Sequence, residues 1–368
     1  MPQSVCFIDG RSVPFAEAAR AAAGLIAASR LPVFLLGSCD VAGIRAAIWL
    51  AERVGGVVDH IESGIAFREL DVMRSFGKFI ITPNEARQRA DTVLLIGSDL
   101  TKFWPDMVER LGLAEVPRLA LQPERRQILW IGAESDEESL SRLVTHKIAA
   151  RSEALPAVIA ALRACNAGRR VALSVSDKSA LDAIAERLQR AQFGLVVYSP
   201  TSLDVLAIEM LAGLVADLNK STRFSTLSIG GSGNAETSMQ TAGWMTGFPV
   251  RTGFGRGYPE HDPWRFDSAR LIESGEADAL VWISCEGELP SWASRTPLVA
   301  LSAANSAASQ SKVHITVGQP GRDHDSAAFA RETQSLAWRR ASHASDLATA
   351  AAALEEISAS LPHEAAAC

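Results

Sequence analysis

Glycine is concentrated in one tract of the chain, between residues 219 and 266. Eight glycines fall between Gly230 and Gly257, interleaved with Ser, Thr, Asn, Arg and aromatic residues. Glycine lacks a Cβ atom, so such a tract suits a backbone that takes positive φ angles repeatedly or approaches a large ligand closely. The polar residues between the glycines suit contacts with phosphates or ring edges. The tract therefore predicts a loop-rich region around a ligand-sized space.

Composition is that of an ordinary soluble globular protein. The 368 residues are 48% hydrophobic and 21% charged, which allows a sizeable core and two domains. A net charge of −6 disfavours a surface that follows nucleic-acid phosphates. No stretch reaches the ~18 apolar residues of a membrane span, and Asp9 and Arg11 stand where a signal peptide needs an apolar core. We expect a cytoplasmic protein that binds neither nucleic acid nor membranes.

The cysteines are scattered along the chain, with no CxxC or CxxxC pair. They are Cys6, Cys39, Cys165, Cys285 and Cys368. An odd, dispersed set disfavours a disulfide framework, an iron–sulfur cluster and a zinc site. Each thiol is expected to be a small buried hydrophobic group, so no metal ligand is predicted among them.

The hydrophobic pattern alternates between strands and helices. Short apolar runs predict strands at residues 33–36, 57–58, 92–96, 118–121, 128–131, 171–175, 194–197, 279–283, 298–301 and 313–317. Helical periodicity predicts helices at residues 42–54, 84–89, 178–191, 203–218 and 345–357. Strands separated by helices at these intervals imply an α/β fold with parallel sheets covered on both faces.

Ligands of open parallel sheets bind beyond the carboxyl ends of the strands. This rule selects the loops at residues 37–40, 97–100, 198–201, 230–236 and 284–288. None of them contains an intact dinucleotide or P-loop motif. The glycine run at residues 253–257 is flanked by Pro249 and Pro259 rather than by a strand and a helix, so it does not predict a nucleotide site.

Four motifs follow one another in and before the glycine-rich tract. They are Asp217-Leu218-Asn219-Lys220-Ser221-Thr222-Arg223-Phe224, Gly233-Asn234, Gly243-Trp244-Met245-Thr246-Gly247-Phe248-Pro249 and Arg256-Gly257-Tyr258-Pro259. In this order they resemble the B component of the formylmethanofuran dehydrogenases, which depend on molybdopterin or tungstopterin. The resemblance implies two interleaved parallel-sheet α/β domains, like the central domains of molybdopterin oxidoreductases. It places residues 1–64 and 202–368 in a discontinuous domain that carries the pterin-site loops, and residues 65–201 in an inserted Rossmann-like domain.

The chain departs from this family where the redox chemistry resides. Active members carry an N-terminal cysteine cluster for a [4Fe–4S] centre and a cysteine or selenocysteine metal ligand after the second strand. Here Cys6 stands alone, and the segment of the expected ligand offers Ser63 or Gly64 instead. A serine ligates molybdenum in related enzymes, so Ser63 stays a candidate ligand, whereas His60 is interpreted as a polar loop residue.

The resemblance also implies which residues belonged to the pterin-site loops. These are Ser38, Ser63, Ser98, Gly233 and Asn234. The loop at residues 284–288 adds negative charge where the phosphates of a pterin cofactor would lie. We therefore expect degenerate loops, without a cofactor or a metal in this chain. The alternative is a molybdopterin or tungstopterin held by unusual ligation.

This pattern of loss resembles the beta subunit of the formyltransferase/hydrolase complexes of methylotrophic bacteria. The resemblance implies an assembly without redox activity in one-carbon metabolism. Such a complex transfers a formyl group from formyl-tetrahydromethanopterin to a methanofuran-like carrier and hydrolyses it to formate. The implied partners are an amidohydrolase-like, a formyltransferase-like and a further subunit. The chain is then expected to be a non-catalytic scaffold, the alternative being the corresponding component of a metallopterin-dependent formylmethanofuran dehydrogenase.

Two loop features remain as candidate sites. Arg223, Arg251 and Arg256 could contact an anion or the acidic tail of the carrier. His261 and Asp262 could act as an acid–base pair, but adjacent residues generally point apart and no activated nucleophile has suitable spacing. The pattern favours a loop braced by Arg–Asp pairs, and no catalytic residue is predicted.

Overall fold

The computed structural model describes residues 4–98, 100–120, 124–133, 138–172, 175–230, 234–303 and 309–362. The chain forms two compact units, and each is described by itself. Unit 1 consists of Met1–Ser63, Ser232–Phe329 and Leu336–Cys368. Unit 2 consists of Gly64–Gly231 and Ala330–Ser335.

Unit 1 is built on a nine-stranded mixed sheet, in the order β11-β10-β4-β3-β12-β13-β14-β1-β2. The five strands from β4 to β14 are parallel, and the strands added at both ends pair antiparallel. The bounds are β1 Cys6–Ile8, β2 Arg11–Val13, β3 Pro32–Leu36, β4 Val57–His60, β10 Thr252–Gly253, β11 Glu260–His261, β12 Ala279–Ser284, β13 Leu298–Ser302 and β14 Val313–Thr316. A separate two-stranded sheet contains β15 Ser326–Ala330 and β16 Ser335–Arg339.

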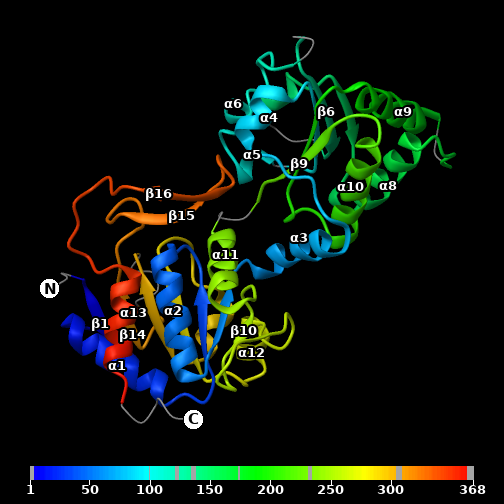
Figure 1. Ribbon diagram of the computed structural model, residues 1–368. Helices are drawn as coiled ribbons and strands as arrows, with labels where there is room; N and C mark the ends of the chain where they lie inside the picture. Colours follow the sequence, from blue (N-terminus) through cyan, green and yellow to red (C-terminus); the bar gives the residue numbers. More distant parts are fainter. Residues whose placement is uncertain are drawn as a thin grey trace. The chain divides into compact units, whose positions relative to one another are not determined.

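Helices cover both faces of this sheet. The helices are α1 Phe15–Ala27, α2 Val41–Val54, α11 Ala235–Thr246, α12 Ser268–Glu273, the 3₁₀ helix η2 Ser291–Arg295 and α13 Ala350–Ala359. Figure 1 shows α1, α13, α2 and α11 along one face. Val33 and Leu35 of β3 pack on the opposite side against Leu271 and Ile272 of α12. Alternate residues of β3 therefore pack into two apolar layers, one on each face of the sheet.

Unit 2 contains a five-stranded parallel sheet in the order β7-β6-β5-β8-β9. Its strands are β5 Thr92–Ile96, β6 Gln127–Gly132, β7 His146–Ala149, β8 Gly194–Tyr198 and β9 Phe224–Ser228. Its helices are α3 Ser63–Phe76, α4 Pro83–Arg89, α5 Leu100–Phe103, α6 Met107–Arg110, α7 Glu138–Ser141, η1 Ser152–Ala154, α8 Leu155–Asn166, α9 Val175–Arg190 and α10 Val205–Leu218. Leu94 and Ile96 share one core with Leu211, whereas Val93 and Leu95 share another with Met107.

Several sequence predictions need correction. The sheet of unit 1 is mixed rather than wholly parallel, because short antiparallel strands extend it at both ends. Residues 202–230 belong to unit 2, where β9 pairs with β8, whereas the sequence placed them with the first domain. Residues 118–120 form a turn rather than a strand, and residues 171–172 are irregular, with residues 173–174 outside the described part. The last helix begins five residues later than predicted, at Ala350 after its cap Thr349.

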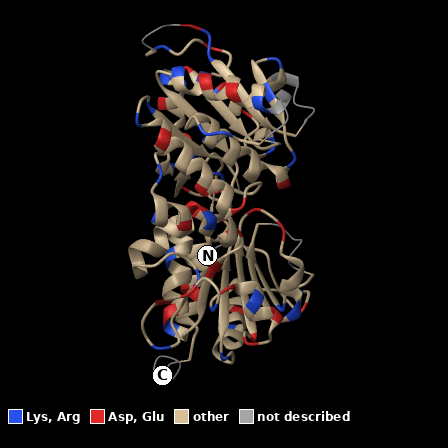
Figure 2. Ribbon diagram, turned by 90° about the vertical axis from the view of Figure 1, so that its right-hand side faces the viewer, with Lys and Arg blue, Asp and Glu red and all other residues tan. Residues whose placement is uncertain are grey.

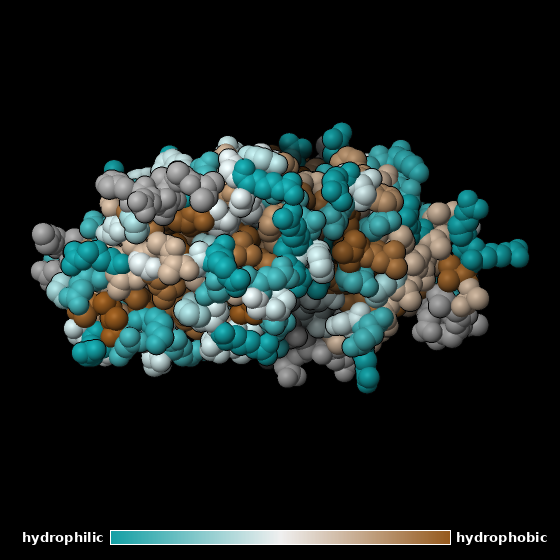
Figure 3. All heavy atoms as spheres, turned by 90° about the horizontal axis from the view of Figure 1, so that it is seen from below, coloured by the Kyte–Doolittle hydropathy of each residue, from teal (hydrophilic) through white to brown (hydrophobic). Residues whose placement is uncertain are grey.

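Positively and negatively charged residues are interspersed along the ribbon in Figure 2. In Figure 3 hydrophobic residues on the visible face occur among hydrophilic ones. No helix within the described ranges is both long and apolar enough to span a bilayer.

Candidate functional site

The carboxyl ends of β3 and β12 form a closely packed floor in unit 1. The Gly37 amide donates to the Ile283 carbonyl at 2.8 Å, and the Ser38 amide donates to Ser284 Oγ at 2.9 Å. Asn234 Nδ2 donates to the Gly37 carbonyl at 3.0 Å. A Cβ atom on Gly37 would lie 2.4 Å from Ser284 Oγ, so only glycine fits there. Two predicted loop residues, Ser38 and Asn234, thus meet at this edge, while Gly233 lies outside the described residues.

Ser63 lies in a cluster centred on Arg251. Arg251 Nε donates to Ser63 Oγ at 3.1 Å and lies 3.6 Å from Oδ1 of the fully buried Asp59. The same guanidinium forms an ion pair with Asp267, and Asp59 Oδ2 accepts from the Ser268 amide at 3.0 Å. Burial raises the pKa of Asp59, while the Arg251 charge and the hydrogen bonds oppose this shift. The serine at the expected ligand position therefore contacts a cation.

His60 is a buried strand residue rather than the polar loop residue that the sequence suggested. It ends β4 and is 1% exposed. Its Nδ1 accepts from the Glu62 amide at 3.0 Å, which leaves the proton of the neutral ring on Nε2. That nitrogen is buried without a hydrogen-bond partner among the described residues. Burial lowers the pKa of His60 to about 4, so the ring is neutral at physiological pH.

A second buried carboxylate, Asp40, begins α2 beside two cysteines. Asp40 Oδ1 accepts from the Gly43 amide at 3.0 Å and caps the helix. Cys39 and Cys285 are free and buried, and burial raises the pKa of both thiols, that of Cys285 to about 12. These thiols are therefore protonated and poor nucleophiles or metal ligands. His324, from a distant loop, approaches Asp40 at 3.8 Å.

The corresponding edge of unit 2 is closed by its own side chains. Ser98 Oγ accepts from the Ala133 amide at 2.9 Å, and Trp130 Nε1 donates to the Gly97 carbonyl at 2.8 Å. At the end of β8 the Tyr198 hydroxyl donates to Glu69 at 2.8 Å, and Glu69 also pairs with Lys78. Burial raises the pKa of Tyr198, so its phenol stays protonated. The predicted residue Ser98 thus braces a loop.

The predicted arginine contacts are divided between the two units, and the two in unit 1 lie apart. Arg223 precedes β9 and is exposed at the amino end of its strand. In unit 1, Arg251 pairs with Asp59 near the carboxyl end of β4. Arg256 follows β10, whose Gly253 pairs with Val57 at the amino end of β4. Arg256 is exposed and pairs with Glu260 at 3.2 Å. Arg251 and Arg256 thus lie toward opposite ends of one strand.

His261 and Asp262 have separate structural contacts. His261 Nδ1 lies 3.0 Å from the Arg251 carbonyl. Asp262 Oδ1 accepts from the amides of Trp264 and Arg265 at 2.9 and 2.8 Å. These contacts to backbone groups hold the loop after β11, and the Arg–Asp pair near it joins Arg251 to Asp267.

No group of three or more His, Cys, Asp or Glu side chains in the described ranges has an arrangement that could hold a metal ion. The sequence reasoning missed Asp59 and Asp40 as buried charges. Asp59 directly follows two apolar residues of β4, and Asp40 stands four residues after the end of β3, which was a usable signal because carboxylates near strand ends face the ligand edge. The partners Arg251 and His324 lie roughly two hundred or more residues away, and no local pattern connects them.

Comparisons with known proteins agree with this architecture. No protein-family model matches the chain. The FhcB protein of the formyltransferase/hydrolase complex of Methylorubrum extorquens is 34% identical over 321 residues, which cover 86% of this chain and 85% of that protein. The B component of the tungsten-containing formylmethanofuran dehydrogenase 2 of Methanocaldococcus jannaschii is 23% identical over 292 residues, covering 76% of this chain and 66% of that protein.

A solved structure extends the similarity over almost the whole chain. It is the crystal structure of the formyltransferase/hydrolase complex (FhcABCD) from Methylorubrum extorquens in complex with methylofuran. One of its chains is 33% identical and superposes with a TM-score of 0.86 over 96% of this chain and 98% of that chain. The chain therefore belongs to the FhcB family of formyltransferase/hydrolase complex subunits, which is related to the B component of the formylmethanofuran dehydrogenases.

Proposed function

We propose that this chain is a structural, non-catalytic subunit of an Fhc-type complex. Such a complex would move a formyl group from formyl-tetrahydromethanopterin to a methanofuran-like carrier and hydrolyse it to formate. The observation that carries the proposal is that polar groups at the carboxyl edges bond to one another. Ser63 binds Arg251, Ser98 binds Ala133, and Asn234 binds Gly37.

The donor chemistry at Ser63 supports the absence of a metallopterin. A serine that ligates molybdenum or tungsten would have to present an anionic oxygen to the metal. Ser63 Oγ instead accepts a hydrogen bond from Arg251 Nε, which places a fixed positive charge beside it. A metal cation bound there would be repelled at close range by the guanidinium. Ser63 therefore fits the role of an Arg251 ligand better than that of a metal ligand.

The carboxyl edge is equally unsuited to the phosphate groups of such a cofactor. Glu286 and Glu288, in the loop after β12, are exposed and add negative charge at the carboxyl edge. Like charges would oppose the phosphate groups of a pterin cofactor. In the proposed function, transfer and hydrolysis belong to an amidohydrolase-like and a formyltransferase-like subunit. This chain contributes its two α/β units as a support.

A second candidate function is that of the B component of a metallopterin-dependent formylmethanofuran dehydrogenase. The similarity to such a component of a tungsten-containing dehydrogenase favours it. It requires Ser63 to leave Arg251 and to turn toward a metal.

The predicted carrier contacts stay part of the proposal. Arg223 and Arg256 are exposed, as contact with an acidic carrier tail requires. If Arg256 makes that contact, Arg256→Glu should weaken binding of the carrier by the assembled complex. Unchanged affinity in an equilibrium binding assay would remove Arg256 from the proposal.

The function is tested by activity in the assembled complex. Complexes containing Ser63→Ala or Ser98→Ala should transfer the formyl group and release formate at rates close to those of the unmodified complex. Size-exclusion chromatography checks that each complex remains assembled. A loss of ~10²-fold or more in an intact Ser63→Ala complex, the size expected for a group acting in a transition state, would contradict the proposal.

A further inference from the structure

Four large apolar side chains are exposed at the end of α3 and in the segment that follows it. Met73, Phe76 and Phe79 are each about half exposed, and Ile80 is 69% exposed. All four fall within one short stretch of unit 2, and we call them the α3 patch. Single exposed apolar residues are common on protein surfaces, whereas a group of this kind marks a contact site.

The lysine of this stretch points inward, which reverses the usual arrangement of a protein surface. The Lys78 side chain is 7% exposed and forms an ion pair with Glu69. Its Nζ lies 5.3 Å from the centre of the Tyr198 ring, and the Tyr198 hydroxyl donates to Glu69 at 2.8 Å. Lysine is ordinarily exposed, and phenylalanine and isoleucine are ordinarily buried. The stretch thus places a charge inside and its apolar side chains outside.

The backbone holds this arrangement in place. The Thr226 amide and Thr226 Oγ1 both donate to the Phe79 carbonyl, at 2.6 and 3.0 Å. Ile80 forms a parallel bridge with the same threonine of β9, and the next residue, Ile81, is buried in the core. The apolar side chains therefore project from a segment that is tied to the sheet.

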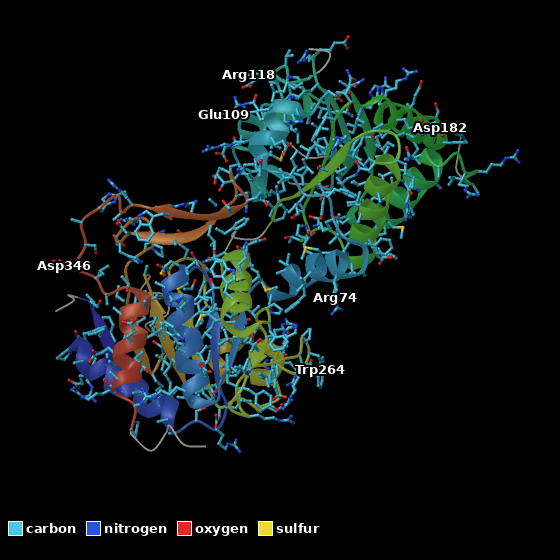
Figure 4. The ribbon with its side chains drawn as sticks, in the orientation of Figure 1. Arg74, Glu109, Arg118, Asp182, Trp264 and Asp346 are labelled. Carbon is cyan, nitrogen blue, oxygen red and sulfur yellow. The ribbon has the colours of Figure 1, made fainter. Side chains whose placement is uncertain are left out.

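All four charged residues between Glu69 and Ile81 are paired with one another. Glu69 pairs with Lys78, as described above. Arg74 extends from α3 (Figure 4), and its Nη2 lies 3.4 Å from Oδ1 of Asp71. Each helical position turns the side chain by about 100°, so this second pair lies beside Met73 rather than over it. A surface that covers the α3 patch would meet apolar groups, and its best complement is apolar and uncharged.

The size of the α3 patch indicates a protein partner. Half-exposed side chains of this kind each offer roughly 100 Å², so the four together offer roughly 400 Å². This is the size of the largest apolar patch on a typical monomer, which is often functional. It is about half of what one partner contributes to a standard interface, as expected for an apolar centre with a polar rim. A net charge of −6 disfavours a second copy of this chain or an anionic bilayer as the occupant.

We propose that the α3 patch binds another subunit of an Fhc-type complex, through an apolar and uncharged face of that subunit. Met73, Phe76, Phe79 and Ile80 become buried at the centre of this contact. The contact rests on the proposed function, since it requires the chain to act within such a complex. It gives the supporting role of the chain a location in unit 2.

Oxidation of Met73 tests this contact in the unmodified protein. Dilute hydrogen peroxide converts an exposed methionine to its sulfoxide, with water as the other product. Peptide mass spectrometry should show Met73 oxidised ~10-fold or more slowly in the assembled complex than in the isolated full chain. Met107 is fully buried and should be oxidised slowly in both, which checks that the chain stays folded. Equal rates at Met73 in the two samples would overturn the proposal.

Ile80→Lys places a charge in the α3 patch, and Leu119→Lys is its matched control. Leu119 is similarly exposed and lies in a turn elsewhere in unit 2. Lysine is tolerated at exposed sheet edges, so the isolated Ile80→Lys chain should unfold at the same temperature as the unmodified chain. Its affinity for the remaining subunits should fall ~30-fold or more in an equilibrium binding assay, the effect of a central interface residue. Unchanged affinity, or an equal loss for Leu119→Lys, would contradict the contact.

Other occupants of the α3 patch would give different results. A dimer of the isolated chain that Ile80→Lys dissociates in analytical ultracentrifugation would assign the patch to a second copy. Binding to phosphatidylglycerol vesicles that Ile80→Lys abolishes would assign it to a membrane, and either result would overturn the proposal. A complex that assembles with Met73 still reactive contradicts the α3 contact alone. An unmodified chain that binds none of the other subunits contradicts the proposed function instead.

Discussion

Two buried aspartates near the carboxyl edge of the unit 1 sheet have different cationic partners. Asp59 lies 3.6 Å from the Arg251 guanidinium, whereas Asp40 lies 3.8 Å from the His324 imidazole. Arg251 also contacts Ser63 and Asp267, whereas Asp40 uses its other oxygen to cap α2. The contact of Asp59 thus belongs to a network of side chains, and that of Asp40 is a single contact at the start of a helix.

Removal of Arg251 should have the largest effect. Arg251→Gln leaves Asp59 buried without its counter-charge, and we expect unfolding free energy to fall by about 3–5 kcal/mol at neutral pH. The loss should shrink in acid, because a protonated Asp59 needs no cation. Urea unfolding at several pH values measures it.

Arg256→Gln is the matched control for Arg251→Gln. Arg256 makes an exposed ion pair with Glu260, so its removal should change stability little. Equal losses of unfolding free energy for the two substitutions would show that the Asp59–Arg251 ion pair is no stronger than an exposed pair.

His60 sharpens the comparison, because it is a buried imidazole whose Nδ1 accepts from a backbone amide instead of facing a carboxylate. Its pKa is lowered to about 4 from an ordinary value near 6.5, so the unfolded chain binds the proton more readily than the folded one. Stability should therefore fall as the pH drops from about 6.5 to 4, by about 3 kcal/mol in total.

The change that isolates this effect is His60→Gln. Urea unfolding at steps of pH should show a shallower acid loss in the variant than in the unmodified chain. If unfolding free energy fell equally with pH in both proteins, the pKa of His60 would not be lowered by folding.

A smaller effect is expected at Gly37, in the floor between the two aspartates. A Cβ atom there would lie 2.4 Å from Ser284 Oγ, so Gly37→Ala should cost about 1–3 kcal/mol. Gly243 in α11 has open space around its Cβ position, and Gly243→Ala should be neutral or stabilising by up to about 1 kcal/mol. Thermal unfolding compares the two, and a harmless Gly37→Ala would show that the floor is loosely packed.

The sequence predicted those elements whose hydrophobic pattern is local. The strands that became β3, β5, β8 and β12 are continuous apolar runs, because both of their faces are buried. Helix α11 was missed, since Gly243 and Gly247 at its end suggested a loop, although Gly247 is its left-handed cap. Residues 118–121 were predicted as a strand from their apolar side chains, but the structure has a turn after Pro117.

The candidate site was predictable only where residues follow a strand directly. Ser38, Ser63 and Ser98 were located by the resemblance and by the strand-end rule, and Ser38 and Ser98 follow β3 and β5 as expected. The contacts of Asp59 with Arg251 and of Asp40 with His324 join residues far apart in the chain. Such pairings depend on the folded arrangement of loops and have no local signature in one sequence.

The most direct test is to measure molybdenum, tungsten and released pterin in the purified complex that contains this chain. The account predicts that all three are far below one equivalent per chain, because the carboxyl edge uses its polar groups internally. One equivalent of either metal together with pterin, lost on Ser63→Ala while the complex stays assembled, would contradict it.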